Sequence, residues 1–254
     1  MSKGWIKFVA AFALCVAILS LTTMAQAGDK KIGTDIGDLA PNFEVYTLDG
    51  KKATLNDYKG KLLFVNFWGW WCPPCIKEAE TLMKLSKRFE GKMEFIFVGV
   101  TTFYKGDKPL DPAAFAEGFG PELEEFKIGL AKARLVRPDS TIIKEHPERL
   151  PEFEARNKEV VNYYMTSRTS LFDFRGYWER QFRAKTNERY GVPVTYLIDR
   201  EGHIKLDINP NDQYWDQNDD ILNDFIADKD LSHYTQRFPI PEKHQRQPQT
   251  AGSK

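Results

Sequence analysis

Two nearly continuous apolar runs flank an amphipathic segment in the first half of the chain. The run Leu62–Trp68 has the composition of a central strand covered on both faces, and Met93–Val100 is a second run of the same kind. Between them, Cys72–Phe89 repeats its apolar residues at helical spacing and is followed by Gly91, a residue type that commonly ends helices. The order strand, helix, strand predicts a parallel pair joined by a right-handed crossover.

Shorter β-prone runs predict two hairpins. The first joins Asn42–Tyr46 to Lys52–Thr54 across a turn that contains Asp49-Gly50, a strong hairpin signal. The second joins Val194–Ile198 to His203–Ile208. Both hairpins are expected to extend the sheet that the two long runs begin.

The stretch between Phe103 and Tyr190 is charged but rich in aromatic residues, and it is too long for a simple loop in a compact domain. We expect it to be mostly helical. Pro112, Pro121 and Pro151 are expected in the first turns of helices, where proline loses no hydrogen bond.

Apolar periodicity continues toward the C-terminus. Phe174, Trp178 and Phe182 recur at four-residue steps, and we interpret this stripe as core packing, with a partner-binding groove as the alternative. A last amphipathic helix is expected at about 217–227. The polar residues 239–254 are expected to form a flexible tail.

The first residues have the pattern of a secretory signal peptide. Two lysines precede the apolar run Phe8–Leu21, and Ala25-Gln26-Ala27 supplies the small residues of a signal-peptidase site. We therefore expect residues 1–27 to be cleaved, which places the mature protein in the periplasm. The alternative is an uncleaved inner-membrane anchor, for which the run is slightly short. Cys15 would leave with the peptide, and two cysteines would remain.

Composition narrows the class of protein. The 254 residues include 36 Lys and Arg against 36 Asp and Glu, spread along the whole length, so no basic field favours nucleic acid as a partner. A hydrophobic content of 42% is enough for one well-buried core with an appended subdomain. We expect one domain at residues 33–238, interrupted by an insertion at about 104–189.

The candidate chemistry lies at Cys72 and Cys75, which two prolines separate at the expected strand-to-helix junction. The helix N-terminus stabilises a thiolate on Cys72, which is therefore the expected nucleophile. Cys75, one turn further along, would be shielded and would resolve the mixed disulfide. A purely structural bridge is disfavoured because so short a loop removes little chain entropy. A zinc site would need two further ligands, and the four histidines show no pairing pattern.

Three more positions complete the candidate site. Glu78 follows Cys75 by three residues, from where its carboxylate could relay a proton to the buried thiol; complementarity to the helix dipole is the alternative role. The Val192-Pro193 bond is a candidate cis peptide, and the Val192 backbone could pair with a substrate strand. The expected substrate-binding residues are therefore Trp71, Pro73, Pro74, Val192 and Pro193.

Four segments of the chain fit one known pattern: Gly37–Phe43, Leu62–Trp68, Trp71–Cys75, and Tyr190–Pro193 with the strand to Asp199. Together they resemble the TlpA/ResA/DsbE-like thioredoxin-family proteins of bacterial envelopes, over about residues 33–103 and 188–228. The resemblance implies a thioredoxin fold, dithiol-disulfide exchange and a cis bond at Pro193. Together with the residue pattern, it predicts a thioredoxin-like α/β fold with an N-terminal β-hairpin extension and a long, mostly helical insertion before the cis-Pro strand, longer than the family's usual insertion. Glu78 matches the helix glutamate of the ResA-like branch, whereas Asn66 stands where thioredoxins carry a buried Asp. Peroxiredoxins share the motif at Gly37–Phe43, but their Thr-x-x-Cys pattern is absent from this sequence.

The favoured function is an extracytoplasmic reductase that acts on protein thiols and disulfides and receives electrons from a membrane dithiol carrier, without a cofactor or metal. No histidine separates the cysteines, which favours a potential near that of thioredoxin. The alternatives are a disulfide oxidase or isomerase, and a non-catalytic adaptor or Cu(I)-binding protein. No Met or His cluster flanks the thiols to favour copper.

Overall fold

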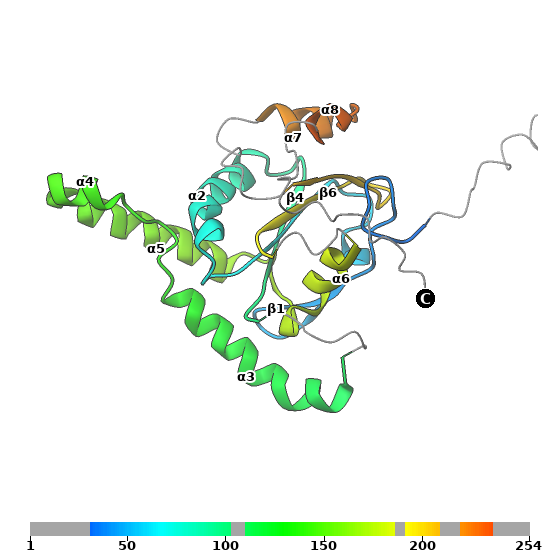
Figure 1. Cartoon of the computed structure of the whole chain (residues 1–254), viewed down its shortest axis with the longest axis horizontal. Coiled ribbons are helices and arrows are strands. Elements are labelled where there is room, and N and C mark those ends of the chain that lie inside the picture. The colour runs from blue at the N-terminus through cyan, green and yellow to red at the C-terminus, as the bar shows by residue number, and fades with distance from the viewer. Residues whose placement is uncertain (1–30, 103–109, 186–190, 209–218, 236–254) are drawn as a thin grey trace, which may run out of the picture. The chain divides into compact units, whose positions relative to one another are not determined.

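The computed structural model of the chain describes residues 31–102, 110–185, 191–208 and 219–235, without the side chains of 183–185. These residues build one mixed sheet with the strand order β2-β1-β5-β4-β3-β6-β7 (Figure 1). The strands are β1 (Glu44–Thr47), β2 (Lys52–Thr54), β3 (Leu63–Trp68), β4 (Glu94–Gly99), β5 (Ser170–Phe172), β6 (Val194–Ile198) and β7 (Ile204–Ile208). The helices are η1 (Leu55–Tyr58), α2 (Pro73–Arg88), α3 (Pro112–Ala131), α4 (Ser140–Glu145), η2 (Pro147–Arg149), α5 (Leu150–Thr166), η3 (Phe174–Gly176), α6 (Tyr177–Lys185), α7 (Asp219–Ile226) and α8 (Ser232–Thr235).

The centre of the sheet has the predicted topology. Strands β3 and β4 are parallel and are joined through α2. Strand β6 pairs antiparallel with β3 and places Thr195 opposite Asn66, and β7 pairs antiparallel with β6. These four strands lie in the order β4-β3-β6-β7, and along the chain α2 follows β3 and α7 follows β7. This is the arrangement of the thioredoxin fold, so the expected fold class is confirmed.

Alternation along β3 divides the core between the two faces of the sheet. Phe64 and Trp68 belong to the apolar cluster that includes residues of α2, α3, α5 and α7, whereas Val65 and Phe67 belong to the cluster that includes Phe182 of α6. Helices α2 and α6 accordingly lie on opposite sides of the sheet (Figure 1). Asn66 is the polar exception on the α2 side, and it is 1% exposed.

The insertion adds a strand that the sequence did not predict. Strand β5 pairs parallel with β4 and antiparallel with β1, so it joins the N-terminal hairpin to the central strands. The expected hairpin of β1 and β2 is confirmed, with Tyr46 opposite Lys52. A strand of three residues is too short to produce a periodic signal, and its formation depends on pairing with neighbours on both sides.

Two predictions about the insertion helices are wrong in detail. Pro121 lies inside α3 rather than in a first turn, because the buried residues Leu123 and Phe126 continue the packing of the helix beyond the lost hydrogen bond. The aromatic stripe is not one helical face: Arg175 has a φ of 57° and breaks it, so that Phe174 and Phe182 pack in different clusters. Burial of these two rings is confirmed.

Several expectations lie partly or wholly outside the described residues. They include the signal peptide at 1–27, the tail at 239–254, and the first residues of the helix predicted at 217–227, of which α7 is the described part. The ends of the insertion at 103–109 and 186–190 lie outside as well. Within the described ranges, no helix is both long and apolar enough to cross a membrane.

Candidate active site

The two cysteines lie where β3 gives way to α2. Cys72 is the N-cap residue of α2, and its backbone amide donates to the Gly69 carbonyl at 3.0 Å to close the intervening turn. Pro73 and Pro74 occupy the first helical positions, where a missing N–H breaks no helical bond. The Cα atoms of Cys72 and Cys75 are 5.3 Å apart and the two side chains form a disulfide, as the Cys-x-x-Cys spacing predicts.

Two backbone groups of opposite polarity face the Cys72 sulfur. The Cys75 amide nitrogen lies 3.4 Å from Cys72 Sγ and donates toward it, which favours negative charge on that atom after reduction. The carbonyl oxygen of Val192 lies 3.3 Å away on the other side. A disulfide sulfur has no proton to donate, so this contact becomes a hydrogen bond only when Cys72 is a thiol. The geometry thus favours a thiolate through the helix and a thiol through Val192.

Both cysteines are buried, although only Cys75 was expected to be shielded. Cys75 is 1% exposed, as predicted, but Cys72 is only 3% exposed. The cause is tertiary: the segment that carries Val192 passes beside Cys72, and both cysteines belong to the apolar cluster on the α2 side of the sheet. Little of the Cys72 side chain is therefore accessible to an attacking group.

The predicted substrate-binding residues differ in exposure. Trp71 is 36% exposed, and its indole N–H donates to the Val100 carbonyl at 3.2 Å, which fixes the ring. Pro73 is exposed and Pro74 and Val192 are half-buried, whereas Pro193 is buried. The Val192-Pro193 peptide bond is cis, as expected.

Glu78 lies in a hydrogen-bonded chain that crosses from α2 to the cis-Pro strand. The Asn66 side-chain amide donates to Glu78 Oε1 at 3.1 Å and to Thr195 Oγ1 at 3.0 Å, and thereby uses both of its hydrogens. Burial raises the pKa of the Glu78 carboxyl to about 8, against the opposing effect of the Asn66 hydrogen bond. At neutral pH Glu78 is therefore mostly protonated, and it can both give and take a proton near pH 8.

The insertion contributes a residue to this region that the sequence did not single out as functional. The Tyr164 hydroxyl of α5 donates to the Ala79 carbonyl of α2 at 3.2 Å, and its ring lies 4.6 Å from that of Trp68. Burial, followed by the negative charge of Glu78, raises the pKa of Tyr164 well above its usual value. The spacing of Phe153, Val160 and Tyr164 along the chain can indicate only that Tyr164 is buried, because its neighbours come from other segments.

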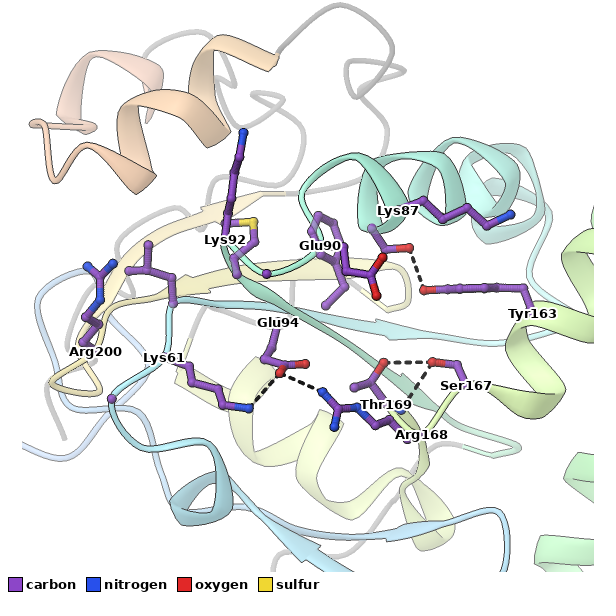
Figure 2. A pocket seen from close by; sticks show the side chains of 16 residues that line it. Lys61, Lys87, Glu90, Lys92, Glu94, Tyr163, Ser167, Arg168, Thr169 and Arg200 are labelled. Atoms are coloured by element: carbon purple, nitrogen blue, oxygen red, sulfur yellow. Dashed lines mark hydrogen bonds and ion pairs between the residues drawn. The ribbon is translucent and has the colours of Figure 1, made fainter.

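No group of three or more His, Cys, Asp or Glu side chains that could hold a metal ion occurs among the described residues. A groove of about 670 Å³ lies at the opposite ends of β3 and β4 from the cysteines (Figure 2). In it, the Glu94 carboxylate accepts hydrogen bonds from Lys61 at 2.7 Å and from Arg168 at 3.1 Å. These bonds join the segments that lead into β3 and β5 to the first residue of β4, away from the dithiol site.

The fold and the dithiol together define a class, thioredoxin-fold proteins with a Cys-x-x-Cys pair at the start of the first core helix. Residues 36–117 match the AhpC/TSA family. Over 120 residues the chain is 37% identical to thiol-disulfide oxidoreductase ResA of Bacillus thuringiensis subsp. konkukian, a match that covers 44% of this chain and 69% of that protein. The chain therefore belongs to the ResA-like family of thiol-disulfide oxidoreductases.

Two other relatives are matched over less than two thirds of their own length. The thioredoxin-like protein YneN of Bacillus subtilis is 38% identical over 90 residues, which are 35% of this chain and 52% of YneN. ResA of Geobacillus thermodenitrificans is 35% identical over 108 residues, which are 42% of this chain and 59% of that protein. Among solved structures, the thioredoxin domain of a thiol-disulfide oxidoreductase from Bacteroides vulgatus is 21% identical with a TM-score of 0.42, over 76% of this chain and 98% of that one.

Proposed function

We propose that the protein is an extracytoplasmic thiol-disulfide reductase that acts on protein disulfides through Cys72 and Cys75. The observation that carries the proposal is the position of Cys72, which caps α2, is bonded to Cys75 and has its sulfur next to the Cys75 amide. Reduction of this disulfide leaves one thiol at the helix N-terminus, where a thiolate is favoured, and the second one turn deeper.

The proposed cycle has two exchange steps. The Cys72 thiolate attacks one sulfur of a substrate disulfide, forms a mixed disulfide and expels the first substrate thiolate. The Cys75 thiol then loses its proton and attacks the Cys72 sulfur, which closes the intramolecular disulfide and expels the second substrate thiolate. Two electrons have then passed from the protein to the substrate. A membrane dithiol carrier would return two electrons and regenerate both thiols.

Glu78 is the proposed acceptor of the Cys75 proton. It lies three residues from Cys75 on the same helix, and Asn66 holds its carboxyl by a hydrogen bond. A carboxyl with a pKa of about 8 is close enough to neutrality to exchange a proton during turnover. A protein substrate would pair in extended form with the Val192 backbone, next to Trp71 and Pro73, which would bring its disulfide to Cys72.

The direction of electron flow is tested by equilibrating the protein with glutathione redox buffers. We expect a midpoint nearer the ~−270 mV of thioredoxin than the ~−120 mV of DsbA, because no histidine between the cysteines stabilises the thiolate of Cys72. A midpoint above about −150 mV would overturn the reductase proposal in favour of an oxidase. Refolding of a reduced multi-disulfide protein, with formation of its disulfides, would instead favour the oxidase or isomerase alternative.

Protein substrates and location are tested in the source cells. A Cys75→Ser variant leaves the mixed disulfide on Cys72 without a resolving thiol, so mass spectrometry of the trapped species identifies the substrate. The absence of any protein adduct would count against a protein-directed role. If Cys72→Ser instead leaves the cellular phenotype intact, an adaptor function becomes the better account. N-terminal sequencing of the mature protein tests cleavage of residues 1–27.

A further inference from the structure

The insertion helix α3 interlocks with the dithiol domain through two glycines. A β-carbon on Gly99, at the end of β4, would lie 2.1 Å from the ring of Phe126 of α3. A β-carbon on Gly129 of α3 would lie 2.2 Å from the indole of Trp70. Each side therefore supplies one aromatic ring and one glycine that leaves room for the other ring. Such close approach is available only where the side chain is a single hydrogen.

Trp70 belongs to the turn that delivers Cys72 to the helix. It lies between Gly69 and Trp71, and the hydrogen bond from the Cys72 amide to the Gly69 carbonyl encloses it. Its ring packs against the apolar cluster that contains both cysteines and Leu130 of α3. The backbone position of Cys72 therefore depends on how the Trp70 ring packs against Gly129.

The alignment of Cys72 with the helix is sensitive to small movements. Its sulfur lies 3.4 Å from the Cys75 amide nitrogen and 3.3 Å from the Val192 carbonyl oxygen. These two groups have opposite effects on a thiolate. A displacement of the turn by a few tenths of an ångström changes their balance, and displacement away from the helix makes the thiolate less favourable.

We propose that Trp70 is a positioning residue for the dithiol, and that the insertion influences the reactivity of Cys72 because Gly129 of α3 leaves the space in which the Trp70 ring packs. The inference rests on the proposed thiol-disulfide function and adds to it a role for the inserted helix. Trp70 does not touch a sulfur; it acts through the turn. If Trp70 only filled space in the core, its loss would lower stability without changing the reactivity of Cys72.

The test compares two alanine substitutions in the same helix. Gly129→Ala places a methyl group inside the Trp70 ring position, whereas Gly120→Ala adds the same group where no atom lies within 4 Å. Each reduced full-length protein is treated with iodoacetamide at pH 7, and mass spectrometry follows modification of Cys72. We expect alkylation about twofold slower in Gly129→Ala, as a rise of about half a pKa unit from a midpoint near 7 gives at pH 7, and a wild-type rate in Gly120→Ala.

Trp70→Ala supplies a second approach if Gly129→Ala does not fold. It removes the same contact from a half-buried position, and it should slow alkylation of Cys72 to a similar extent. In the Trp70→Ala background, Gly129→Ala should have no additional effect, because the added methyl group no longer meets a ring.

The outcomes separate this inference from the proposed function. If wild-type Cys72 is reactive and Gly129→Ala reacts at the wild-type rate, or Trp70→Ala does so where Gly129→Ala cannot be obtained, the positioning role is wrong and the reductase proposal stands. An effect of Gly129→Ala that persists unchanged without Trp70 also overturns the inference. If wild-type Cys72 is itself inert toward iodoacetamide at pH 7, both proposals fail.

Discussion

Replacing Glu78 by glutamine tests the proposed proton transfer within the dithiol site. The substitution keeps the size of the side chain and an oxygen that can accept from the Asn66 amide, which donates to Glu78 Oε1 at 3.1 Å. It removes only the ability to gain and lose a proton near pH 8. Any change in the pH dependence of Cys75 attack can then be assigned to that proton.

The magnitude follows from the pKa of Glu78. Burial raises it from 4.5 to about 8, so ionising the carboxyl costs up to about 5 kcal/mol more in the folded protein than in water. About one-tenth of Glu78 is ionised at pH 7 and about nine-tenths at pH 9. A step that needs the carboxylate as a base therefore accelerates about tenfold between these pH values.

The assay mixes reduced protein with glutathione disulfide, quenches with acid and separates the mixed disulfide from the Cys72–Cys75 disulfide by mass. The rate of conversion of the first into the second should carry an inflection near pH 8 in the wild type that Glu78→Gln lacks. Glu80→Gln is the matched control, because Glu80 lies on the same helix but pairs with Arg156 and Lys84. Identical pH profiles for wild type and Glu78→Gln would refute the role of Glu78.

Further predictions concern the partners of Glu78 and the packing of the insertion. Asn66→Ala removes the donor that favours the Glu78 carboxylate, so the inflection should move above pH 8; an unmoved inflection would contradict this reading. Because burial raises the pKa of both Glu78 and Asp173 to about 8, the folded chain holds these protons more tightly than the unfolded chain. The free energy of unfolding in urea should therefore fall as pH rises from 5 to 9, and less steeply in Glu78→Gln. Asp173→Ala leaves the amides of Trp178 and Glu179 without their acceptor and should lower the free energy of unfolding at pH 6 by about 1–3 kcal/mol, whereas a loss below about 0.5 would count against this role. Gly99→Ala should cost about 1–3 kcal/mol of unfolding free energy because of the Phe126 ring, while Gly120→Ala should not destabilise; equal stability of the two variants would contradict the interlocking of α3.

Local signals explain why the centre of the fold could be predicted from sequence. The apolar runs that become β3 and β4 are long enough to identify strands, and the amphipathic spacing of α2 identifies a helix between them. The Asp49-Gly50 turn identifies the first hairpin. The positions of Cys72 and Cys75 follow from the same local pattern, because the motif lies directly at the junction of a strand and a helix.

The remaining features depend on contacts between distant segments. Strand β5 forms only because β1 and β4 pair with it, and α3 continues through Pro121 because its apolar face has a partner. The sequence showed that Asn66 stands where thioredoxins carry a buried Asp. It could not show that the Asn66 amide donates a hydrogen bond to Glu78. The burial of Cys72 beside Val192 and the seating of Trp70 on Gly129 leave no periodic signal either.

We expect the N-terminus of α2 to make Cys72 largely a thiolate near neutral pH. The most direct measurement is an ultraviolet titration of thiolate absorbance in the Cys75→Ser variant, in which Cys72 is the thiol of the dithiol site, with Cys72→Ser/Cys75→Ser subtracted as the background. We expect a midpoint below that of a free cysteine, about 8.5, with most of the thiolate formed by about pH 7.5. A midpoint at or above about 8.5 would show that burial and the Val192 carbonyl outweigh the helix, and it would contradict the proposed nucleophile.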